Sequence, residues 1–591
     1  MAGLFGRLCA SCCHRLSSSG YVGLPRVTAN SFRFINACAD EQNQKARGRI
    51  VVRVADGSLF MSMYLDLDGK SRMLNRVRTD AFEKTLHRIG LVSSVVSGNA
   101  EYDGDHPVVL VHGSGEKSGQ PKEPGIPNIK AFLDGDILSI GEDQYIVSVN
   151  PPSVLGISLP TYISKGATVY PSVQAEFVPD NVFTYEWRRI VNQGGNTCEV
   201  VVSREEAYTP TLEDVGSSLS LTVTPVVEDS ALPASGRTIV SAEVGDDVVR
   251  LGYTEFSAHT PEPHAVDSAK LRVVTYNILA DMYLTEGFGG SSFSYCDNKA
   301  LSLGYRDMAL SRELPAYHAD ILCLQEVEEK RFQSTIMSCL RPLSYQGKTV
   351  MKHNMPEGIA TIWRTDRFLY RDCKTYIVRE EFMNNPLLAD IYSSVPPWVR
   401  SELRNRNSVL QLTHLQQKSD GRELIVANTH LYYSPNADGQ RLILALCMVR
   451  LLDAFKKAVM EASTASLPLA VVFCGDFNTI PERTVHELMT TGQVAPTSGF
   501  KEANRDGLNY ECTIPTKFGS SLPHPSVPWT NYTGLFIGML DYIYYDESVL
   551  KLHKLVPMPK EEVVREFTAL PSFRFPSDHL PVINDLEFVK S

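Results

Sequence analysis

Short apolar runs alternate with longer helical patterns from Leu271 to the end of the chain. Five of the runs have the length and the β-branched content of buried strands: LRVVTYNIL, ADILCLQEV, ELIVANTHLYY, LAVVFCGDF and GMLDYIYY. Residues 438–462 instead place apolar side chains at intervals of three and four, which predicts a long helix with one buried face. Residues 270–591 are therefore predicted to form an α/β domain.

The part of the chain before residue 270 has the pattern of β structure. Residues 45–155 alternate apolar and polar side chains around Asp56-Gly57, which predicts a hairpin within a β-rich domain. Residues 160–250 place Trp187 on a strand-like segment, followed by an Asp-x-Gly turn and alternating leucines. This pattern is similar to an immunoglobulin-like sandwich without its disulfide. We expect an all-β N-terminal region that precedes the α/β domain.

The first 40 residues differ in composition from the rest of the chain. They contain four arginines and many serines, and no acidic residue precedes Asp40. This composition is typical of a transit peptide. We expect residues 1–40 to direct import into the mitochondrial matrix and to be removed before the first predicted strand. The alternative is an untargeted tail.

Composition narrows the classes of function. The chain has 591 residues and a formal net charge of −11, which argues against a protein that grips nucleic acid over its whole surface but allows a local basic groove or a metal-centred site. Its apolar runs are too short to span a membrane. Its twelve cysteines include one Cys-x-x-Cys spacing, at Cys9 and Cys12, which has no partner pair to complete a zinc site. Cys323 and Cys474 are predicted to be core residues because they lie within apolar runs.

Polar side chains close or interrupt the predicted strands of the α/β domain. Each one alone fits a strand end or a helix cap better than a functional group. The whole set is poorly explained by unrelated caps, and it therefore predicts one functional site. The set consists of Asn277, Glu326, Asn428, His430, Asp476, Asn478, Asp541 and His579.

The donor types in this set indicate a hard cation. Oxygen donors predominate, and there is neither a cysteine cluster nor a close histidine pair, so Mg²⁺ or Mn²⁺ is favoured over zinc. Such a cation favours hydrolysis of a phosphate ester. We expect His430 and His579 to stabilise charge that develops on the phosphate, and Asp541 to orient a histidine.

The order of these motifs resembles that of the exonuclease–endonuclease–phosphatase superfamily over about the last 320 residues. The resemblance implies a sandwich of two mixed β-sheets flanked by helices. It also implies that Glu326, Asp476 and Asn478 hold the metal and that Asp476 is the catalytic acid or base. Asn277 and Asn428 are assigned to the surroundings of the substrate, the former as a supporting residue.

Two further stretches resemble the deadenylase branch of that superfamily. NTHLYYSPNADGQR places Pro435 five residues after His430, and TNYTGLFIGMLDYIYY places Phe536 five residues before Asp541. The resemblance implies that Pro435 and Phe536 hold an adenine ring between them and that Asn478 contacts the nucleotide.

The resemblance leaves three functions open. The first is a Mg²⁺-dependent 3′-end exoribonuclease that releases 5′-AMP from 2′,5′-linked oligoadenylate and from 3′,5′-linked poly(A) tails of mitochondrial RNA. The second is a phosphatase of small adenine dinucleotides. The third is a non-catalytic RNA-binding protein, and the intact set of predicted site residues argues against it.

Overall fold

The structure is a computed structural model, and its described residues form two compact units. The first unit contains the described residues up to Pro152, and the second contains nearly all of those that follow. The predicted transit peptide lies outside the described part of the chain and stays a prediction. The described residues are 48–54, 57–67, 70–96, 108–115, 117–123, 125–178, 181–193, 196–226, 236–246, 253–257, 269–285, 290–463, 467–495 and 512–589.

The first unit is a mixed six-stranded sheet with a helix packed on it. Its elements are β1 (Gly48–Arg53), β2 (Phe60–Leu67), β3 (Lys70–Val77), α2 (Phe82–Val96), β4 (Val108–Val111), α3 (Asn128–Ala131), β5 (Ile137–Ile140) and β6 (Asp143–Val149). The strand order is β3-β2-β1-β6-β5-β4. Strands β1 and β2 form the predicted hairpin, and β1 also pairs in parallel with β6. Helix α2, which the sequence analysis did not predict, buries Phe82 and Ile89 in the core of this unit.

The second unit begins with a β domain, whose strands are β7 (Ser153–Ser158), β8 (Ile163–Ser164), β9 (Ser172–Glu176), β10 (Phe183–Gln193), β11 (Asn196–Ser203), β12 (Ser218–Pro225) and β13 (Arg237–Gly245). Five of them form a sheet in the order β11-β10-β12-β13-β8, and β7 pairs with β9. Trp187 is fully buried against the alternating Leu219, Leu221 and Val223. The immunoglobulin-like assignment and the predicted domain limits stay predictions.

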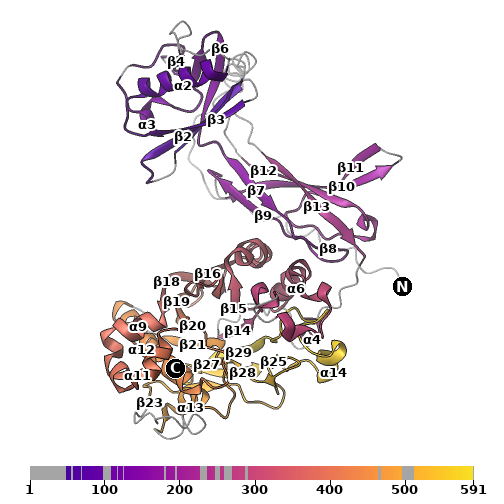
Figure 1. The fold of residues 1–591 in the computed structure, drawn as a ribbon, viewed down its shortest axis with the longest axis vertical. Helices are drawn as coiled ribbons and strands as arrows, with labels where there is room; N and C mark the ends of the chain where they lie inside the picture. Colours follow the sequence, from indigo (N-terminus) through magenta and orange to yellow (C-terminus); the bar gives the residue numbers. More distant parts are fainter. Residues whose placement is uncertain are drawn as a thin grey trace, which may run out of the picture. The chain divides into compact units, whose positions relative to one another are not determined.

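The rest of the second unit contains two six-stranded sheets, and it has the predicted α/β sandwich architecture (Figure 1). The first catalytic sheet consists of β14 (Lys270–Asn277), β15 (Ile321–Glu328), β16 (Tyr345–Met351), β17 (Glu357–Arg364), β28 (Leu550–Leu555) and β29 (Val582–Phe588). The second catalytic sheet consists of β18 (Phe368–Ile377), β19 (Val409–Gln417), β20 (Glu423–His430), β21 (Ala470–Asp476), β24 (Phe518–Ser520) and β27 (Asp541–Asp546). Their orders are β16-β17-β15-β14-β29-β28 and β18-β19-β20-β21-β27-β24.

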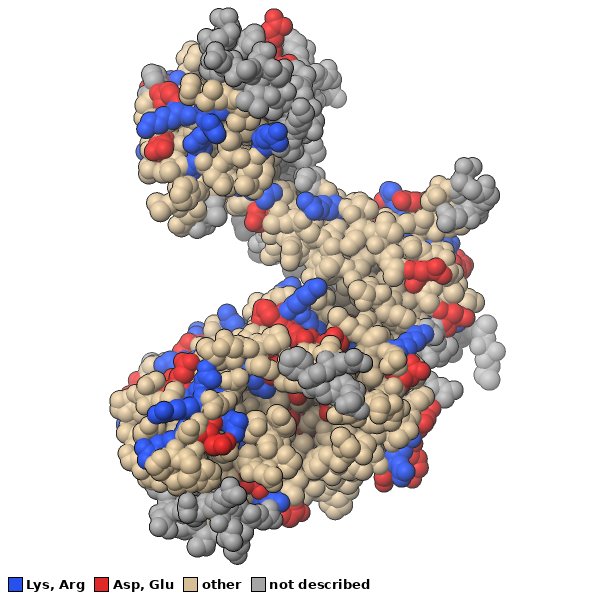
Figure 2. Space-filling view, viewed as in Figure 1, with Lys and Arg blue, Asp and Glu red and all other residues tan. Residues whose placement is uncertain are grey.

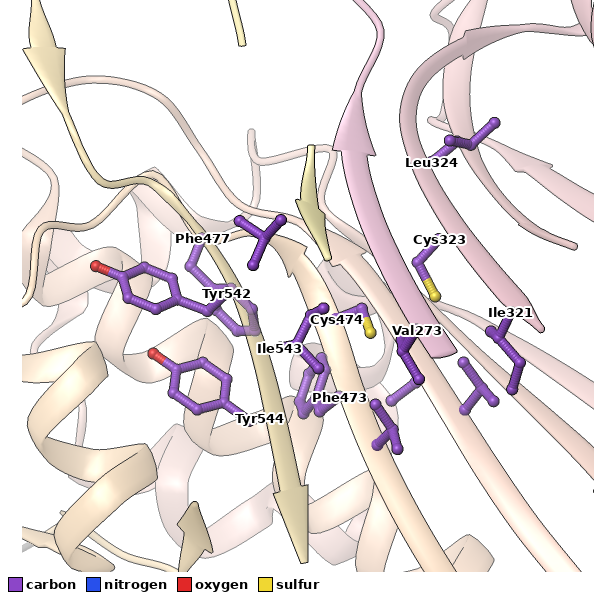
Figure 3. Packing of buried hydrophobic residues seen from close by; sticks show 14 of the residues in the cluster. Val273, Ile321, Cys323, Leu324, Phe473, Cys474, Phe477, Tyr542, Ile543 and Tyr544 are labelled. Atoms are coloured by element: carbon purple, nitrogen blue, oxygen red, sulfur yellow. The ribbon is translucent and has the colours of Figure 1, made fainter. Parts of the chain in front are cut away.

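The core of this part lies between the two sheets and beneath the helices that cover them. Cys323 on β15 and Cys474 on β21 are fully buried, and their side chains lie between the strands of the two sheets (Figure 3). They are core residues, as predicted. Phe473 and Tyr544 extend the same apolar cluster beneath the second catalytic sheet. Because the central strands are buried on both faces, their sequences are continuous apolar runs.

Helix α12 (Asp438–Ala462) has the predicted bounds and packs on β19 of the second catalytic sheet. The predicted apolar face is buried, including Leu442, Met448 and Phe455. No described side chain caps the N-terminus of this helix. Ala437 occupies the cap position, and the Asp438 carboxylate pairs with Arg441 and with Arg483 instead.

Among the described residues, no helix is both long enough and apolar enough to cross a membrane. On the face of the second unit seen in Figure 2, acidic and basic side chains are interspersed and do not form one large field. A nucleic-acid substrate would therefore depend on local contacts at a site more than on a general attraction.

Candidate active site

The directions of the strands bring most of the predicted polar residues to one edge of each catalytic sheet. Strands β14 and β15 are parallel, as are β20 and β21, so the ends of each pair lie side by side. Strands β27 and β29 run antiparallel to their neighbours and therefore begin at those edges. In the second catalytic sheet, His430, Asp476 and Asp541 are paired directly across three adjacent strands. Side chains in such a row point to the same face.

The carboxylate of Asp476 is the centre of the site. Its Oδ2 lies 3.1 Å from Asn277 Nδ2, 3.5 Å from His430 Nε2 and 3.7 Å from His579 Nε2. Its Oδ1 accepts a 2.9 Å hydrogen bond from the backbone N–H of Asn478. Gly475 lets β21 approach β20, because a Cβ there would lie 2.4 Å from the Thr429 carbonyl oxygen.

Glu326 reaches the same site because strand β15 is irregular. The pairing between β15 and β17 shifts between Gln325 and Val327, so Glu326 occupies a β-bulge, and its φ of 57° is left-handed. Its Oε2 accepts a 2.9 Å hydrogen bond from the Ala280 N–H. Left-handed φ values also occur at Leu279 and at Asn478, and backbone strain of this kind is common at functional sites.

Asn277 joins the two central carboxylates. Its Nδ2 donates to Glu326 Oε1 at 2.9 Å and to Asp476 Oδ2 at 3.1 Å, and its Oδ1 accepts from the Leu279 N–H at 3.0 Å. Both amide hydrogens are therefore used within the protein. Asn277 thus supports Glu326 and Asp476 and has no amide hydrogen left for a substrate, and its predicted place among the substrate-binding residues stays a prediction.

Burial makes both carboxylates hard to ionise. For Glu326, burial, followed by the charges of Asp578 and Glu357, raises the pKa to about 7. For Asp476, burial and then the charge of Asp541 raise the pKa to about 7, although His579 and Asn277 oppose this. Negative charge is therefore concentrated here beyond what the nearby donors neutralise, and a cation would relieve it.

His579 lies between two carboxylates. Its Nδ1 is 2.8 Å from Asp541 Oδ2, which also accepts a 2.6 Å hydrogen bond from the Thr530 hydroxyl. Burial alone would lower the pKa of His579, but the charges of Asp541, Asp578 and Asp476 outweigh it and raise the pKa well above the usual value. The imidazole is therefore a cation at neutral pH, oriented by Asp541 as the sequence analysis predicted.

His430 has a cationic neighbour instead. Its Nδ1 lies 3.1 Å from Lys352 Nζ, and that ammonium also pairs with Glu357 Oε1 at 2.7 Å. Burial, and then the charges of Lys352 and His579, lower the pKa of His430 well below its usual value, so the ring is neutral. Because an ammonium group can only donate, Nδ1 is the acceptor and the ring proton lies on Nε2, which faces Asp476.

Lys352 and Glu357 were missed by the sequence analysis. Lys352 follows β16 and Glu357 begins β17 on the hairpin KHNMPEG, which has the composition of an exposed turn. Glu357 is nevertheless fully buried and the Lys352 side chain is only 11% exposed. The Tyr283 hydroxyl donates to Glu357 Oε1 at 3.1 Å. The only sequence signal for Lys352 and Glu357 is a charged side chain at a strand end. The other site residues were predicted from the same signal.

The prediction that Asn428 binds substrate is wrong. It lies on the same strand as His430, two residues earlier, and is fully buried between the sheets. Its Nδ2 donates to the carbonyls of Ala360 and Leu324 at 2.9 and 3.3 Å, and its Oδ1 accepts from Gln325 Nε2 at 2.9 Å. Asn428 therefore joins the two sheets, and a strand-end pattern alone cannot distinguish this role from a functional one.

Asn478 directs one side of its amide into the protein. Its Nδ2 donates to the Leu431 carbonyl at 3.0 Å, and within the described part of the chain nothing donates a hydrogen bond to its Oδ1. Pro435 is exposed, and so is Phe536, at 42%. Phe536 lies at the turn between the short strands β25 (Asn531–Tyr532) and β26 (Ile537–Gly538). The assigned roles of Pro435, Asn478 and Phe536 stay predictions.

The turn that carries Phe536 is connected to the histidine–carboxylate pair. At its base, Thr530 donates to Asp541, and Asn531 Nδ2 lies 3.4 Å from Asp578 Oδ2. At its tip, the N–H of Phe536 donates to the Thr533 hydroxyl at 3.0 Å. An aromatic ring at this tip is therefore held on the same short hairpin as the residues that orient His579.

A cavity of about 610 Å³ opens beside the other histidine. Its wall includes Glu326 and His430 from the central group, and Arg406 lies over the ring of Tyr432 at 3.8 Å. Tyr433 is 72% exposed at the rim. Neither Pro435 nor Phe536 is among the described residues that line it. A ligand could therefore contact two separate surfaces, the cavity and the Phe536 hairpin.

The residues fit a divalent cation. Ligand atoms of Asp476, Asp541 and His579 lie within 4.8 Å of one another, and of these the two carboxylates can bind a cation while the protonated imidazole cannot. Asp541 Oδ1 is buried, and no described group donates a hydrogen bond to it. This group shares Asp476 with the predicted set of Glu326, Asp476 and Asn478. Glu326 is connected to it through the Asn277 amide, so its role as a ligand stays a prediction.

The fold and the site are those of a hydrolase. Residues 274–579, more than half of the chain, match the Endonuclease/Exonuclease/phosphatase family, and the chain belongs to this family. The predicted superfamily and fold class are thereby confirmed, and so is the prediction of an enzyme over that of a non-catalytic protein.

The chain is similar to two curated relatives and to one solved structure. The chain is 30% identical over 488 residues to 2′,5′-phosphodiesterase 12 of Mus musculus, which covers 78% of each chain. It is 26% identical over 351 residues to the CCR4-Not complex 3′-5′-exoribonuclease subunit Ccr4 of Candida albicans, which covers 56% of this chain and 42% of that one. The structure of ANGEL2, a 2′,3′-cyclic phosphatase, is 20% identical, with a TM-score of 0.45, and covers 54% of this chain and 96% of that one.

The chain, with its β-rich N-terminal region, is thus similar to a 2′,5′-phosphodiesterase over most of its length, as the sequence analysis implied. The relatives and the family support a nuclease or phosphodiesterase function.

Proposed function

We propose that the protein is a Mg²⁺- or Mn²⁺-dependent exoribonuclease of the mitochondrial matrix. It removes 5′-AMP from the 3′ end of 2′,5′-linked oligoadenylate and of 3′,5′-linked poly(A) tails. The observation that carries the proposal is the central Asp476 carboxylate, which faces one neutral and one cationic imidazole beside a second buried carboxylate. The length of the similarity to 2′,5′-phosphodiesterase 12 supports the substrate class.

The site has a group for each requirement of phosphate-ester hydrolysis. Asp476 and Asp541, with Glu326 beside them, would hold the cation, and a bound cation lowers the pKa of a nearby water and withdraws charge from the phosphate. Asp476 accepts the proton of the attacking water, since its carboxylate lies at the centre of the site, where both imidazoles face it.

The two histidines bind the phosphate. His579, held as a cation by Asp541, donates from Nε2 to an oxygen on which negative charge develops. His430 donates from its own Nε2 as a neutral ring, because Lys352 occupies Nδ1. The ribose hydroxyl of the preceding nucleotide leaves, and the product is a 5′-mononucleotide.

Two surfaces provide for the nucleotides on either side of the scissile phosphate. The exposed Phe536 ring, with Pro435, stacks on an adenine, and such stacking tolerates variation in the backbone. The cavity beside His430, with Arg406 and two tyrosines in its wall, receives the neighbouring nucleotide. Because these contacts fix the bases and the phosphate more than the leaving oxygen, one site can cleave both 2′,5′ and 3′,5′ linkages.

The matrix location rests on the four arginines and the lack of acids in the leader. A fusion of residues 1–45 to a fluorescent reporter should enter mitochondria and be shortened there. A reporter that stays in the cytosol would contradict the location without affecting the enzymatic proposal.

The enzymatic proposal is tested by incubating the purified protein with 2′,5′-triadenylate, poly(A), poly(U) and NADPH, each with Mg²⁺ and with a chelator. We expect AMP from the first two substrates only, and only with the cation. Release of phosphate from NADPH alone would favour the dinucleotide phosphatase instead. Asp476→Asn is the control for contaminating nucleases, because it keeps the shape of the side chain and removes its charge.

A further inference from the structure

One arginine outside the catalytic group connects two of the segments that form the site. Arg306 lies in helix α6 (Leu303–Ala316), and its side chain is completely buried. Its Nε donates to the Pro576 carbonyl at 2.7 Å. Its Nη2 donates to the Ile278 carbonyl at 2.9 Å and also to the Leu279 carbonyl. One planar guanidinium thus holds the loop after β14 against the segment before β29.

The loop on one side of Arg306 holds Glu326. It follows Asn277 directly, and its Ala280 N–H donates to Glu326 Oε2. Its Leu279 N–H orients the Asn277 amide, which bridges to Asp476, and Leu279 itself has a left-handed φ of 57°. A loop in this conformation needs external support, because left-handed φ is unfavourable for a leucine.

The segment on the other side of Arg306 carries His579. Ser577 follows Pro576, and its hydroxyl donates to the Asn277 carbonyl at 2.6 Å. The same hydroxyl accepts a 3.2 Å hydrogen bond from the His579 N–H. The carbonyl that Arg306 binds is therefore three residues from the imidazole, and the intervening contacts are all hydrogen bonds.

Burial of the charged Arg306 guanidinium is unfavourable unless its contacts compensate for the lost hydration. The Nη1 group of Arg306 makes no hydrogen bond within the described part of the chain, and the nearest carboxylate, on Asp281, is 3.5 Å away. Burial lowers the pKa of Arg306 to about 10, so the group is still charged at neutral pH. An apolar side chain would fill the space at less cost, but only a planar fork reaches carbonyls on two segments at once.

The same turn of helix α6 is the place where the β domain packs. A Cβ on Gly304 would lie 2.6 Å from Thr161 Oγ1 and 2.8 Å from Tyr162 Cβ, so the contact requires glycine. The rings of Tyr305 and Tyr162 are 5.8 Å apart, and the Tyr305 hydroxyl donates to the Phe573 carbonyl at 2.7 Å. The residues immediately before Arg306 are therefore fixed by the β domain.

We propose that Arg306 is a positioning residue, which holds the Glu326 loop and the His579 segment in register, and that the β domain supports this geometry by packing on the Gly304–Tyr305 turn. Disturbance of either contact lowers turnover although neither touches the substrate. The measurement of turnover rests on the proposed function. Metal binding is a second measurement, which needs no substrate.

The first test compares Arg306→Lys with Arg272→Lys. Arg272 is a matched control, because it is also buried and makes a bidentate pair with Asp585, but it lies near the opposite end of β14. Both variants should lose thermal stability. Only Arg306→Lys should lose about 10²-fold in kcat, with a weaker affinity for Mn²⁺ measured by calorimetry. Equal kcat and equal Mn²⁺ affinity in the two folded variants would overturn the proposal.

The second test remains informative if Arg306→Lys does not fold. Gly304→Ala disturbs the contact between α6 and the β domain directly, and we expect about a tenfold loss of kcat. Gly519→Ala is its control, because a Cβ there would lie 2.6 Å from side chains on another edge of the molecule. If Gly304→Ala melts at a lower temperature but keeps wild-type kcat and Mn²⁺ affinity, the β domain does not support the site. If the wild-type protein is inactive on every substrate, the proposed function fails, and the Mn²⁺ measurements still decide this inference.

Discussion

The two halves of the active site hold chemically identical rings in opposite electrostatic surroundings. On the Asp541 half, His579 lies 2.8 Å from a carboxylate and is a cation. On the Lys352 half, His430 lies 3.1 Å from an ammonium and is neutral. Both rings direct Nε2 at the same oxygen of Asp476.

In the proposed mechanism, the neighbour of Nδ1 decides what each histidine does at Nε2. A carboxylate keeps a proton available for release as charge develops on the phosphate, which suits a general acid. An ammonium fixes a neutral donor that can bind the phosphate but does not give up its proton. Two imidazoles with equal pKa values could not act one as a general acid and the other as a neutral hydrogen-bond donor at the same pH.

Removal of the Asp476 charge, which both histidines face, should have the largest effect on kcat. Asp476→Asn removes the base and the central metal ligand, and we expect kcat to fall by about 10³-fold or more. Steady-state rates on 2′,5′-triadenylate measure this. A residual rate within tenfold of wild type would show that Asp476 is not central.

The same variant should make the metal-free protein more stable. Because the pKa of Asp476 is raised to about 7 in the folded state, the stabilisation due to its protonated form is complete below its unfolded pKa and is lost as the pH rises through about 7. At pH 8 the ionised carboxylate therefore destabilises the metal-free fold. Asp476→Asn should melt at a higher temperature than wild type at pH 8, and at nearly the same temperature at pH 4.

Asp541→Asn changes the half that holds the cationic ring. Without the neighbouring charge the pKa of His579 falls, so the ring loses its proton at a lower pH as the pH rises. The alkaline limb of the kcat profile should move to lower pH, and kcat at pH 7.5 should fall by about 10²-fold. An unmoved alkaline limb would show that His579 does not act as the acid.

Phe536→Ala and Tyr433→Ala test whether the hairpin beside His579 and the cavity beside His430 differ in their preference for adenine. Stacking on a base contributes about 1–3 kcal/mol, so loss of the Phe536 ring should raise KM by about tenfold or more and reduce the preference for poly(A) over poly(U). Tyr433→Ala, at the rim of the cavity on the other half, should affect both polymers equally. An unchanged preference in Phe536→Ala would remove the adenine site from this hairpin.

Lys352→Met should have the smallest effect on rate and a distinct effect on pH dependence. Loss of the ammonium raises the pKa of His430, so the acid limb of the profile should move to higher pH while kcat near pH 8 falls only several-fold. Because this change leaves Glu357 without its cation, it is best made together with Glu357→Gln. If the acid limb of the double variant stays in place, Lys352 does not control His430.

The sequence predicted the fold and most of the central site because both depend on strand ends. Parallel neighbours put Asn277 beside Glu326 and His430 beside Asp476, and the apolar runs before them locate those ends without a structure. The helix over residues 438–462 was predictable for a similar reason, since a regular period of apolar residues extends over its whole length.

The remaining residues depend on contacts that no local pattern encodes. Asn428 has the same strand context as His430, but it lies two residues earlier on β20 and is therefore fully buried between the sheets and not at their edge. Lys352 is on a hairpin whose composition is that of an exposed turn, and only packing against β20 makes it a partner of His430. No pattern in the sequence around Arg306 indicates contacts with segments 28 and 270 residues away.

The bulge at Glu326 has a consequence for insertions and deletions. Loss of Gln325 would restore regular pairing with β17, because Glu326 would then lie opposite Ile359 in its place. The Glu326 carboxylate would leave the bulge and take the buried position of the Gln325 side chain, which contacts Thr275 and Asn428. Such a chain should have almost no activity, so the length of the strand before the site is constrained as well as its residue types.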